Sequence, residues 1–168
     1  YPHVSRNYGR DRLKLWFKSQ AVYYAINNND MGEARSLWVD IRDYTPERFR
    51  DTLAHIDLAF IGWPGARDDR TLEEIRRSVF EAEKIAVITL GAQGVLVVDG
   101  ESNLERFYAT VAIPVAGTTI GCGDAFIAAF LMAYQAGSSL ADSVVAGQTA
   151  GAAATAWALP LPDEAYEG

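Results

Sequence analysis

Cysteine and positive charge are both scarce in this chain of 168 residues. Cys122 is the one cysteine, so no internal disulfide can form and a reducing compartment is expected. Only 15 lysines and arginines stand against 22 aspartates and glutamates, which gives a net charge of −7. Nucleic-acid binding depends on basic patches that neutralise phosphates, so this balance argues against a nucleic-acid partner.

Long runs of large hydrophobic side chains are missing as well. The segment 143–162 carries no charge, but alanine, glycine and threonine dominate it and offer little apolar surface to reward insertion into lipid. Its Gly147-x-x-x-Gly151 spacing therefore predicts a buried helix that packs closely through its small face, and no membrane partner is expected. Residues 1–11 are polar and mixed, unlike a signal peptide, so a cytoplasmic location is expected.

Apolar periodicity predicts helices and strands along the whole chain. The apolar side chains between Leu13 and Tyr23 fit the buried side of a helix over 12–27, so residues 1–35 are expected to be a helical segment. Further helices are expected at 45–54, 71–84, 123–135 and 139–158, and strands at 36–41, 56–61, 85–90, 95–98 and 107–113.

Strands that alternate with helices imply a parallel sheet covered on both faces. We therefore expect a single α/β domain over 1–168, built as a three-layer α/β/α sandwich around a mainly parallel sheet. The strand pair around Asp99-Gly100 is expected to be a local antiparallel excursion. The Thr45-Pro46 pair and the Thr71-x-x-Glu74 capping-box pattern supply two of the predicted helix starts.

The stretch 117–124, Gly-Thr-Thr-Ile-Gly-Cys-Gly-Asp, runs directly into an apolar helix. Gly121 and Gly123 let the backbone approach a ligand and turn its N–H groups toward it. The first N–H groups of a helix have no partner within it, and the helix dipole favours anions there. Asp124, in the first turn, would stand beside a bound anion and could take a proton from an attacking hydroxyl. Phosphate-binding donors next to a base are the minimal requirement for phosphoryl transfer.

Two other interpretations of this loop stay open on the residues alone. The stretch 121–124 also fits a tight turn whose acid merely stabilises the helix dipole. Cys122 at a helix start could be an activated thiol nucleophile, but His3 and His55 lie far away in the sequence and no Cys–His signature is present. A small side chain in a tight turn is the simpler account of Cys122.

Three features, in this order, resemble the ribokinase-like (PfkB-type) carbohydrate kinases. They are Thr89-Leu90-Gly91-x-x-Gly94 at a strand end, the loop Thr119-x-Gly121-Cys122-Gly123-Asp124, and the small-residue helix after it. The resemblance extends over 36–158 and implies the nucleotide-binding, C-terminal portion of a ribokinase-like fold. The phrase Ile56-Asp57-Leu58-Ala59-Phe60 is similar to the fructosamine and fructoselysine kinases within the family.

This resemblance implies ATP-dependent phosphoryl transfer to a hydroxyl of a sugar or sugar-amine. A small-molecule sugar is then the substrate, ATP and Mg²⁺ are the cofactors, and Asp124 is the general base. The anion hole that the resemblance implies consists of the backbone N–H groups of Gly121, Cys122 and Gly123. The nucleotide-lining residues that it implies are Thr89, Gly91, Gly94, Thr119 and, near the adenine pocket, Gln148.

The chain also departs from the family pattern. Thr118 replaces the first acid of the family's loop, which removes a carboxylate from any monovalent-cation site there. The stretch 62–65, Gly-Trp-Pro-Gly, stands where the family carries an Asn-x-x-Glu motif that organises magnesium, and Asp68 and Asp69 are the nearest acids. They are more simply explained as solvated loop residues, so no metal ligand is assigned.

The sugar-binding half of such kinases is not recognisable before Ser36, so the chain is expected to be the C-terminal part of one. A truncated, non-catalytic nucleotide-binding or interaction module is therefore the alternative function. The sheet edge and apolar surface left by a missing half would favour a homo-oligomer.

Overall fold

The computed structural model describes residues 4–8, 11–15, 22–26, 36–38, 45–54, 56–110, 113–115 and 117–156. The chain divides into two compact units, Tyr1–Phe107 and Tyr108–Gly168. Among the described residues, no helix is long and apolar enough to cross a bilayer. The single α/β domain over 1–168 and the nucleotide-binding portion over 36–158 stay predictions.

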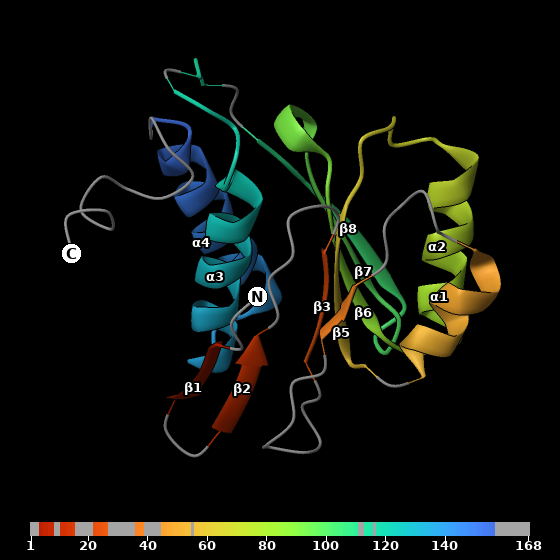
Figure 1. Ribbon diagram of the computed structural model, residues 1–168. Coiled ribbons are helices and arrows are strands. Elements are labelled where there is room, and N and C mark those ends of the chain that lie inside the picture. The colour runs from red at the N-terminus through yellow and green to blue at the C-terminus, as the bar shows by residue number, and fades with distance from the viewer. Residues whose placement is uncertain are drawn as a thin grey trace. The chain divides into compact units, whose positions relative to one another are not determined.

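The first unit contains an antiparallel strand pair, a six-stranded sheet that β8 completes, and two helices (Figure 1). The pair is formed by β1 (Val4–Tyr8) and β2 (Asp11–Leu15). The sheet has the strand order β4-β3-β5-β6-β7-β8. Its strands are β3 (Val22–Ile26), β4 (Ser36–Trp38), β5 (Leu58–Gly62), β6 (Ile85–Thr89), β7 (Gly94–Asp99) and β8 (Leu104–Ala109). The helices are α1 (Pro46–Leu53) and α2 (Arg70–Glu81).

The second unit takes in the last two residues of β8 and the helices α3 (Cys122–Gln135) and α4 (Leu140–Ala154), which pack against each other. Gly137, at φ +89°, ends α3, and Ser139 caps α4 by accepting the N–H of Asp142 at 3.1 Å. Both helices and the glycine between them follow the sequence prediction.

The core of the first unit lies between one face of the sheet and the helices α1 and α2 (Figure 1). Leu72, Ile75 and Val79 recur on one side of α2 and are fully buried. They belong to one cluster with alternate side chains of the sheet, among them Ile61 and Ile88. An amphipathic helix and a period-two strand pattern therefore meet in this core.

Side chains on the opposite face of the same strands are buried as well. Phe60 and Val87 have 1% and 0% of their surface exposed, although neither belongs to the cluster under α1 and α2. Because both faces are buried, β5, β6 and β7 read as continuous apolar runs instead of alternating ones. This is why the sequence placed these three strands correctly.

The prediction of a mainly parallel sheet is wrong. The described pairs include one parallel pair, β5–β6, whereas β3–β4, β3–β5 and β6–β7 are antiparallel. A parallel pair needs a crossover of a dozen or more residues, and α2 supplies one between β5 and β6. The tight turn 90–94 between β6 and β7 is far too short for a crossover, so these strands run antiparallel.

The predicted helix over 12–27 is also wrong. The described residues of the first 35 form the strands β1, β2 and β3. Val22, Tyr23 and Tyr24 are β-branched or aromatic residues that fit a pleated surface, and β3 pairs with both β4 and β5. Pairing on two sides outweighs a weak helical period in the sequence.

Several boundaries differ from the prediction, and two of them have a clear local cause. Asp69, not Thr71, caps α2, since its Oδ1 accepts the N–H of Thr71 at 2.8 Å. β8 begins at Leu104, three residues earlier than predicted, because the turn after β7 is short. The carboxylate of Asp99 accepts the N–H of Ser102 at 3.2 Å and closes that turn.

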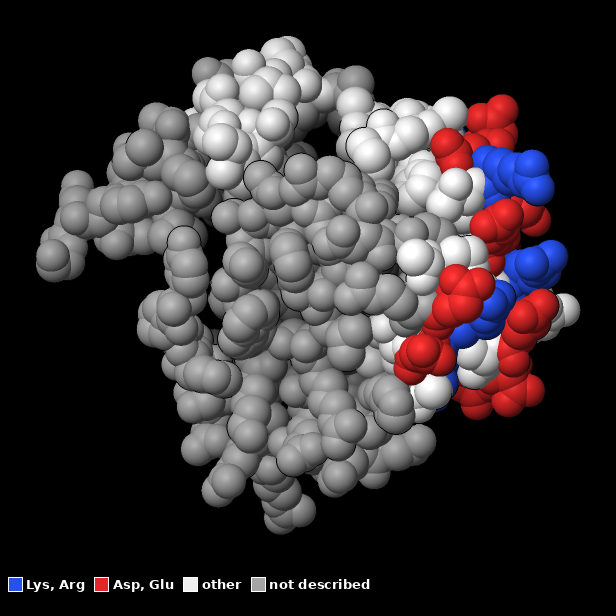
Figure 2. Space-filling model, turned by 45° about the vertical axis from the view of Figure 1, so that its right-hand side comes forward, with Lys and Arg blue, Asp and Glu red and all other residues white. Residues whose placement is uncertain are grey.

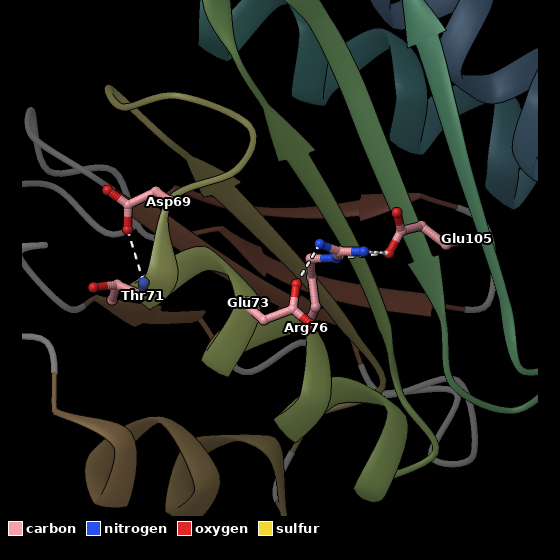
Figure 3. A network of polar contacts seen from close by, with 5 residues as sticks. All are labelled: Asp69, Thr71, Glu73, Arg76 and Glu105. Atoms are coloured by element: carbon pink, nitrogen blue, oxygen red, sulfur yellow. Dashed lines mark hydrogen bonds and ion pairs between the residues drawn. The ribbon is translucent and has the colours of Figure 1, made fainter.

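A polar network joins α2 to β8 (Figure 3). The Arg76 guanidinium donates through Nε to Glu105 at 2.6 Å and lies 2.6 Å from Glu73 through Nη1. The side chains of Arg76 and Glu105 are only 24% and 21% exposed, so solvent screens this ion pair less than it screens the exposed ion pairs of the surface. Arg77–Glu81 is one of these exposed ion pairs. Figure 2 shows acidic and basic side chains intermingled on this side of the molecule.

Replacing Arg76 by leucine is expected to lower the free energy of unfolding by about 1 to 2 kcal/mol, because Glu105 then loses its charged partner in a partly buried place. The matched control is Arg77→Leu, since both partners in Arg77–Glu81 are more than half exposed. That change is expected to stay within about 0.5 kcal/mol. Urea unfolding measures both variants, and equal losses would contradict the structural role given to Arg76.

Candidate active site

The loop before α3 is held in one conformation by its own hydrogen bonds. Ile120 donates its N–H to the Thr118 hydroxyl at 3.1 Å, and Cys122 donates its N–H to the Thr119 carbonyl at 3.3 Å. Gly121 has φ +88°, a left-handed conformation that a residue with a Cβ rarely adopts. The chain therefore turns at Gly121 and enters the helix directly.

Three backbone donors at the start of α3 are available to a ligand. Within the described part of the chain, the N–H groups of Gly121, Gly123 and Asp124 have no hydrogen-bond acceptor. No heavy atom would lie within 4 Å of a Cβ at Gly123, so this side of the turn is open. Of the three predicted anion-hole residues, Cys122 differs, because its N–H binds the carbonyl of Thr119, itself a predicted nucleotide-binding residue.

Asp124 lies in the first turn of α3, where the sequence placed it. Its side chain is exposed, but the protein atoms around the carboxylate still remove part of its hydration, and this desolvation raises its pKa above the ordinary value for aspartate. A carboxylate with a raised pKa is a stronger base once ionised. The arrangement thus places a carboxylate among free N–H donors.

The thiol of Cys122 is not activated. Desolvation raises its pKa above the ordinary value, and a backbone hydrogen bond opposes this rise only in part. Its Sγ lies 3.8 Å from the Thr118 carbonyl. A nucleophilic cysteine needs a lowered pKa, so this geometry argues against the thiol-enzyme interpretation. His3 and His55 lie outside the described residues.

The other predicted nucleotide loop is the β6–β7 turn in the first unit. Gly91 and Gly94 have φ +58° and +138°, and Leu90 donates its N–H to the Gly94 carbonyl at 2.8 Å. Thr89, at the end of β6, accepts the N–H of Trp63 through its carbonyl at 2.9 Å. The turn itself requires both glycines, so their conformation has a local cause. The nucleotide-binding role of these residues stays a prediction.

Gln148 lies on α4 and binds backbone. Its Nε2 donates to the carbonyls of Tyr108 and Ala109, each at 3.3 Å, and to the Thr110 hydroxyl at 3.0 Å. The side-chain amide donor therefore already has three protein acceptors at the end of β8. The predicted place of Gln148 near an adenine pocket stays untested.

The segment after β5 shows no preformed metal site. Among the described residues, no group of three or more histidine, cysteine or acidic side chains is close enough to hold a metal ion. Asp69 is engaged as the cap of α2, and Asp68 is exposed. Trp63, in the place of the family's Asn-x-x-Glu motif, is a core residue whose buried Nε1 has no partner within the described part of the chain.

A pocket of about 650 Å³ lies at the start of α2, and no sequence pattern indicated it. It is lined by Ala66, Arg67, Asp68, Arg70, Glu73, Arg76 and Gln93. Arg67 lies 4.3 Å above the ring of Phe107, while Arg76 is paired with Glu73 (Figure 3). The stretch 66–76 and Gln93 of the β6–β7 turn build this pocket together, which explains why no local pattern predicted it. Gln93 is its link to the β6–β7 turn.

Comparison with known proteins identifies the relatives of this chain. The model of the pfkB family of carbohydrate kinases matches residues 21–156. Fructoselysine 6-kinase of Escherichia coli (strain K12) is 35% identical over 103 residues, which are 60% of this chain and 37% of that protein.

Solved structures share the fold. Adenosine kinase from Sinorhizobium meliloti superposes with a TM-score of 0.57 and 22% identity over 70% of this chain and 38% of its own. A structure described as a ribokinase II from E. coli, in complex with ATP and Mg²⁺, superposes with a TM-score of 0.56 and 16% identity. The match covers 68% of this chain and 37% of that one. The chain thus spans little more than a third of the length of these relatives. With its family model matched from β3 to the end of α4, the chain belongs to the pfkB family of carbohydrate kinases.

Proposed function

We propose that this chain supplies the nucleotide-binding and catalytic part of an ATP-dependent kinase that phosphorylates a hydroxyl of a sugar or sugar-amine. One observation carries the proposal: Asp124 stands in the first turn of α3, next to free backbone N–H donors on a left-handed glycine turn. Membership of the pfkB family supports the same reaction class. The finer assignment of the fold, a ribokinase-like three-layer α/β/α sandwich, belongs to this proposal.

In the proposed reaction, Asp124 accepts the proton of the acceptor hydroxyl while that oxygen attacks the γ-phosphorus of ATP. The new O–P bond forms as the bond from the γ-phosphorus to the bridging oxygen breaks, and ADP leaves. The N–H groups of Gly121 and Gly123 stabilise charge on the transferring phosphoryl group. General base catalysis of this kind typically contributes on the order of 10² to 10⁴ in rate.

The nucleotide and magnesium are assigned from the family and the relatives. Thr89, Gly91, Gly94 and Thr119 are proposed to line ATP, and the structure of a ribokinase II with ATP and Mg²⁺ supports this pair of ligands. Mg²⁺ would neutralise charge on the phosphates. With no metal cluster in the described residues, we propose that the ion is carried in by the nucleotide.

The similarity to fructoselysine 6-kinase supports a fructosamine-type acceptor, in which a sugar carries an amine substituent. A cytoplasmic location and a homo-oligomer are part of the same proposal. Because the chain spans 37% of that relative, a nucleotide-binding module without catalytic turnover is the second candidate function. Calorimetric titration with MgATP, alongside ATP consumption with fructoselysine, separates binding with turnover from binding alone.

Asp124→Asn tests the base. We expect phosphoryl transfer to fall by about 10² to 10⁴, with the affinity for MgATP nearly unchanged, because only the proton acceptor is lost. Asp142→Asn is the matched control, since Asp142 occupies the corresponding first turn of α4. Its activity is expected to equal that of the unchanged protein. Equal activity in the Asp124→Asn protein would refute the assignment of the base.

The pH dependence gives a second test of Asp124. Because desolvation raises its native pKa, the folded protein holds this proton more tightly than the unfolded chain. Unfolding therefore releases a proton between the ordinary and the raised pKa, and this contribution to stability falls as pH rises through that window. We expect Asp124→Asn to be more stable than the unchanged protein above the window and equally stable below it. Urea unfolding across pH measures this difference.

The same shift should appear in the kinetics. Activity, as kcat/KM, is expected to fall on the acid side at a pH above the ordinary aspartate value of about 3.9. An acid limb at or below that value would contradict a desolvated base.

A further inference from the structure

One face of α4 contacts both the loop and the helix of the candidate site. Val144, Gln148, Gly151 and Thr155 follow each other at intervals of four, three and four residues, so they lie on one side of the helix. We call these four residues, with the neighbouring Gly147, the α4 stripe. Val144 and Gly147 are buried, and each of the other three makes at least one contact in the segment 108–126.

The glycines of the α4 stripe allow a close approach to α3. A Cβ at Gly147 would lie 2.7 Å from the ring of Phe126, and a Cβ at Gly151 would lie 3.1 Å from the carbonyl oxygen of Cys122. Neither distance leaves room for an unshifted side chain. The backbone of α4 at Gly151 therefore lies directly against the first turn of α3, the turn that also carries Asp124.

Two further polar contacts of α4 hold the chain that leads into the loop and the first residue of the loop. Gln148 binds Tyr108, Ala109 and Thr110 through its Nε2. Farther along the helix, the Thr155 carbonyl accepts the N–H of Gly117 at 2.9 Å. The end of β8, the start of the loop and the start of α3 are thus all held by one rigid helix.

We propose that the α4 stripe positions the phosphate-binding turn, with Gln148 and Gly151 as positioning residues for Asp124 and the N–H groups of Gly121 and Gly123. This inference rests on the proposed kinase function. It gives Gln148 a different role from the adenine contact that the family resemblance implies. A misplacement of reacting groups by 1 Å can cost about 10² in rate, so a shift of a few tenths of an ångström is kinetically significant.

Gly151→Ala separates positioning from stability in the full chain. Alanine is the better helix former, which offsets the strain of the new contact in the unfolding equilibrium. We expect unfolding to be nearly unchanged, amide exchange of residues 117–125 to accelerate severalfold, and kcat with fructoselysine to fall about tenfold. Thr149→Ala is the control, because this exposed residue lies off the α4 stripe and the change also favours the helix. It should alter neither exchange nor kcat.

Gln148→Met keeps the length and removes the donor. A positioning role predicts faster amide exchange in 117–125 and a lower kcat, with the ratio of KM for ATP to KM for GTP unchanged. A changed ratio of the two KM values with unchanged amide exchange would overturn the proposal. It would support a contact of Gln148 with the adenine base instead. Unchanged exchange in both variants would also overturn it.

The outcomes distinguish this inference from the proposed function. If the unchanged protein neither binds MgATP nor consumes it, the kinase proposal fails, while amide exchange in the variants still reports whether the α4 stripe fixes the turn. If the unchanged protein is active and both variants match it in kcat, the proposed function stands and the positioning inference fails.

Discussion

The close approach of α4 to the start of α3 is the constraint on which the candidate site depends. At Gly151 the backbone of α4 lies so close to α3 that a Cβ added there would be 3.1 Å from the carbonyl oxygen of Cys122. Protein interiors are packed closely enough that such a contact leaves little freedom of movement. The first turn of α3 thereby has a fixed place within its unit. Its free N–H groups and the Asp124 carboxylate are thereby held near one another by the packing of the two helices.

Thr118 illustrates how the chain departs from its family without losing the loop. Its hydroxyl accepts the N–H of Ile120, a local bond that shapes the turn before Gly121. Cys122 is similar in effect: its partly buried thiol has a raised pKa and lies close to the Thr118 carbonyl. Both residues stabilise the conformation of the loop, whereas the chemistry falls to Asp124 and to backbone groups. Backbone donors depend on conformation more than on side-chain identity, which makes such substitutions tolerable.

The sequence predicted those elements whose signals are local. Continuous apolar runs marked β5, β6 and β7, Pro46 marked the start of α1, and the small-residue stretch around Gly147 marked α4. The position of Asp124 in a first helical turn came from the same kind of evidence. Errors arose where pairing decides the structure. Val22 and Tyr24 carry no sign that β3 lies between two partners, and the direction of β7 depends on the length of one turn. The Arg76–Glu105 pair and the pocket beside it join distant segments, so no window of sequence contains them.

β8 has a consequence for how the molecule comes apart. The strand begins in the first unit, where Glu105 is tied to Arg76, and ends in the second, where Gln148 holds the carbonyls of Tyr108 and Ala109. A strand held near both of its ends resists fraying, because its terminal groups keep partners within the protein. β8 therefore has one side-chain anchor near its start, through Glu105, and backbone anchors at its end, through Tyr108 and Ala109.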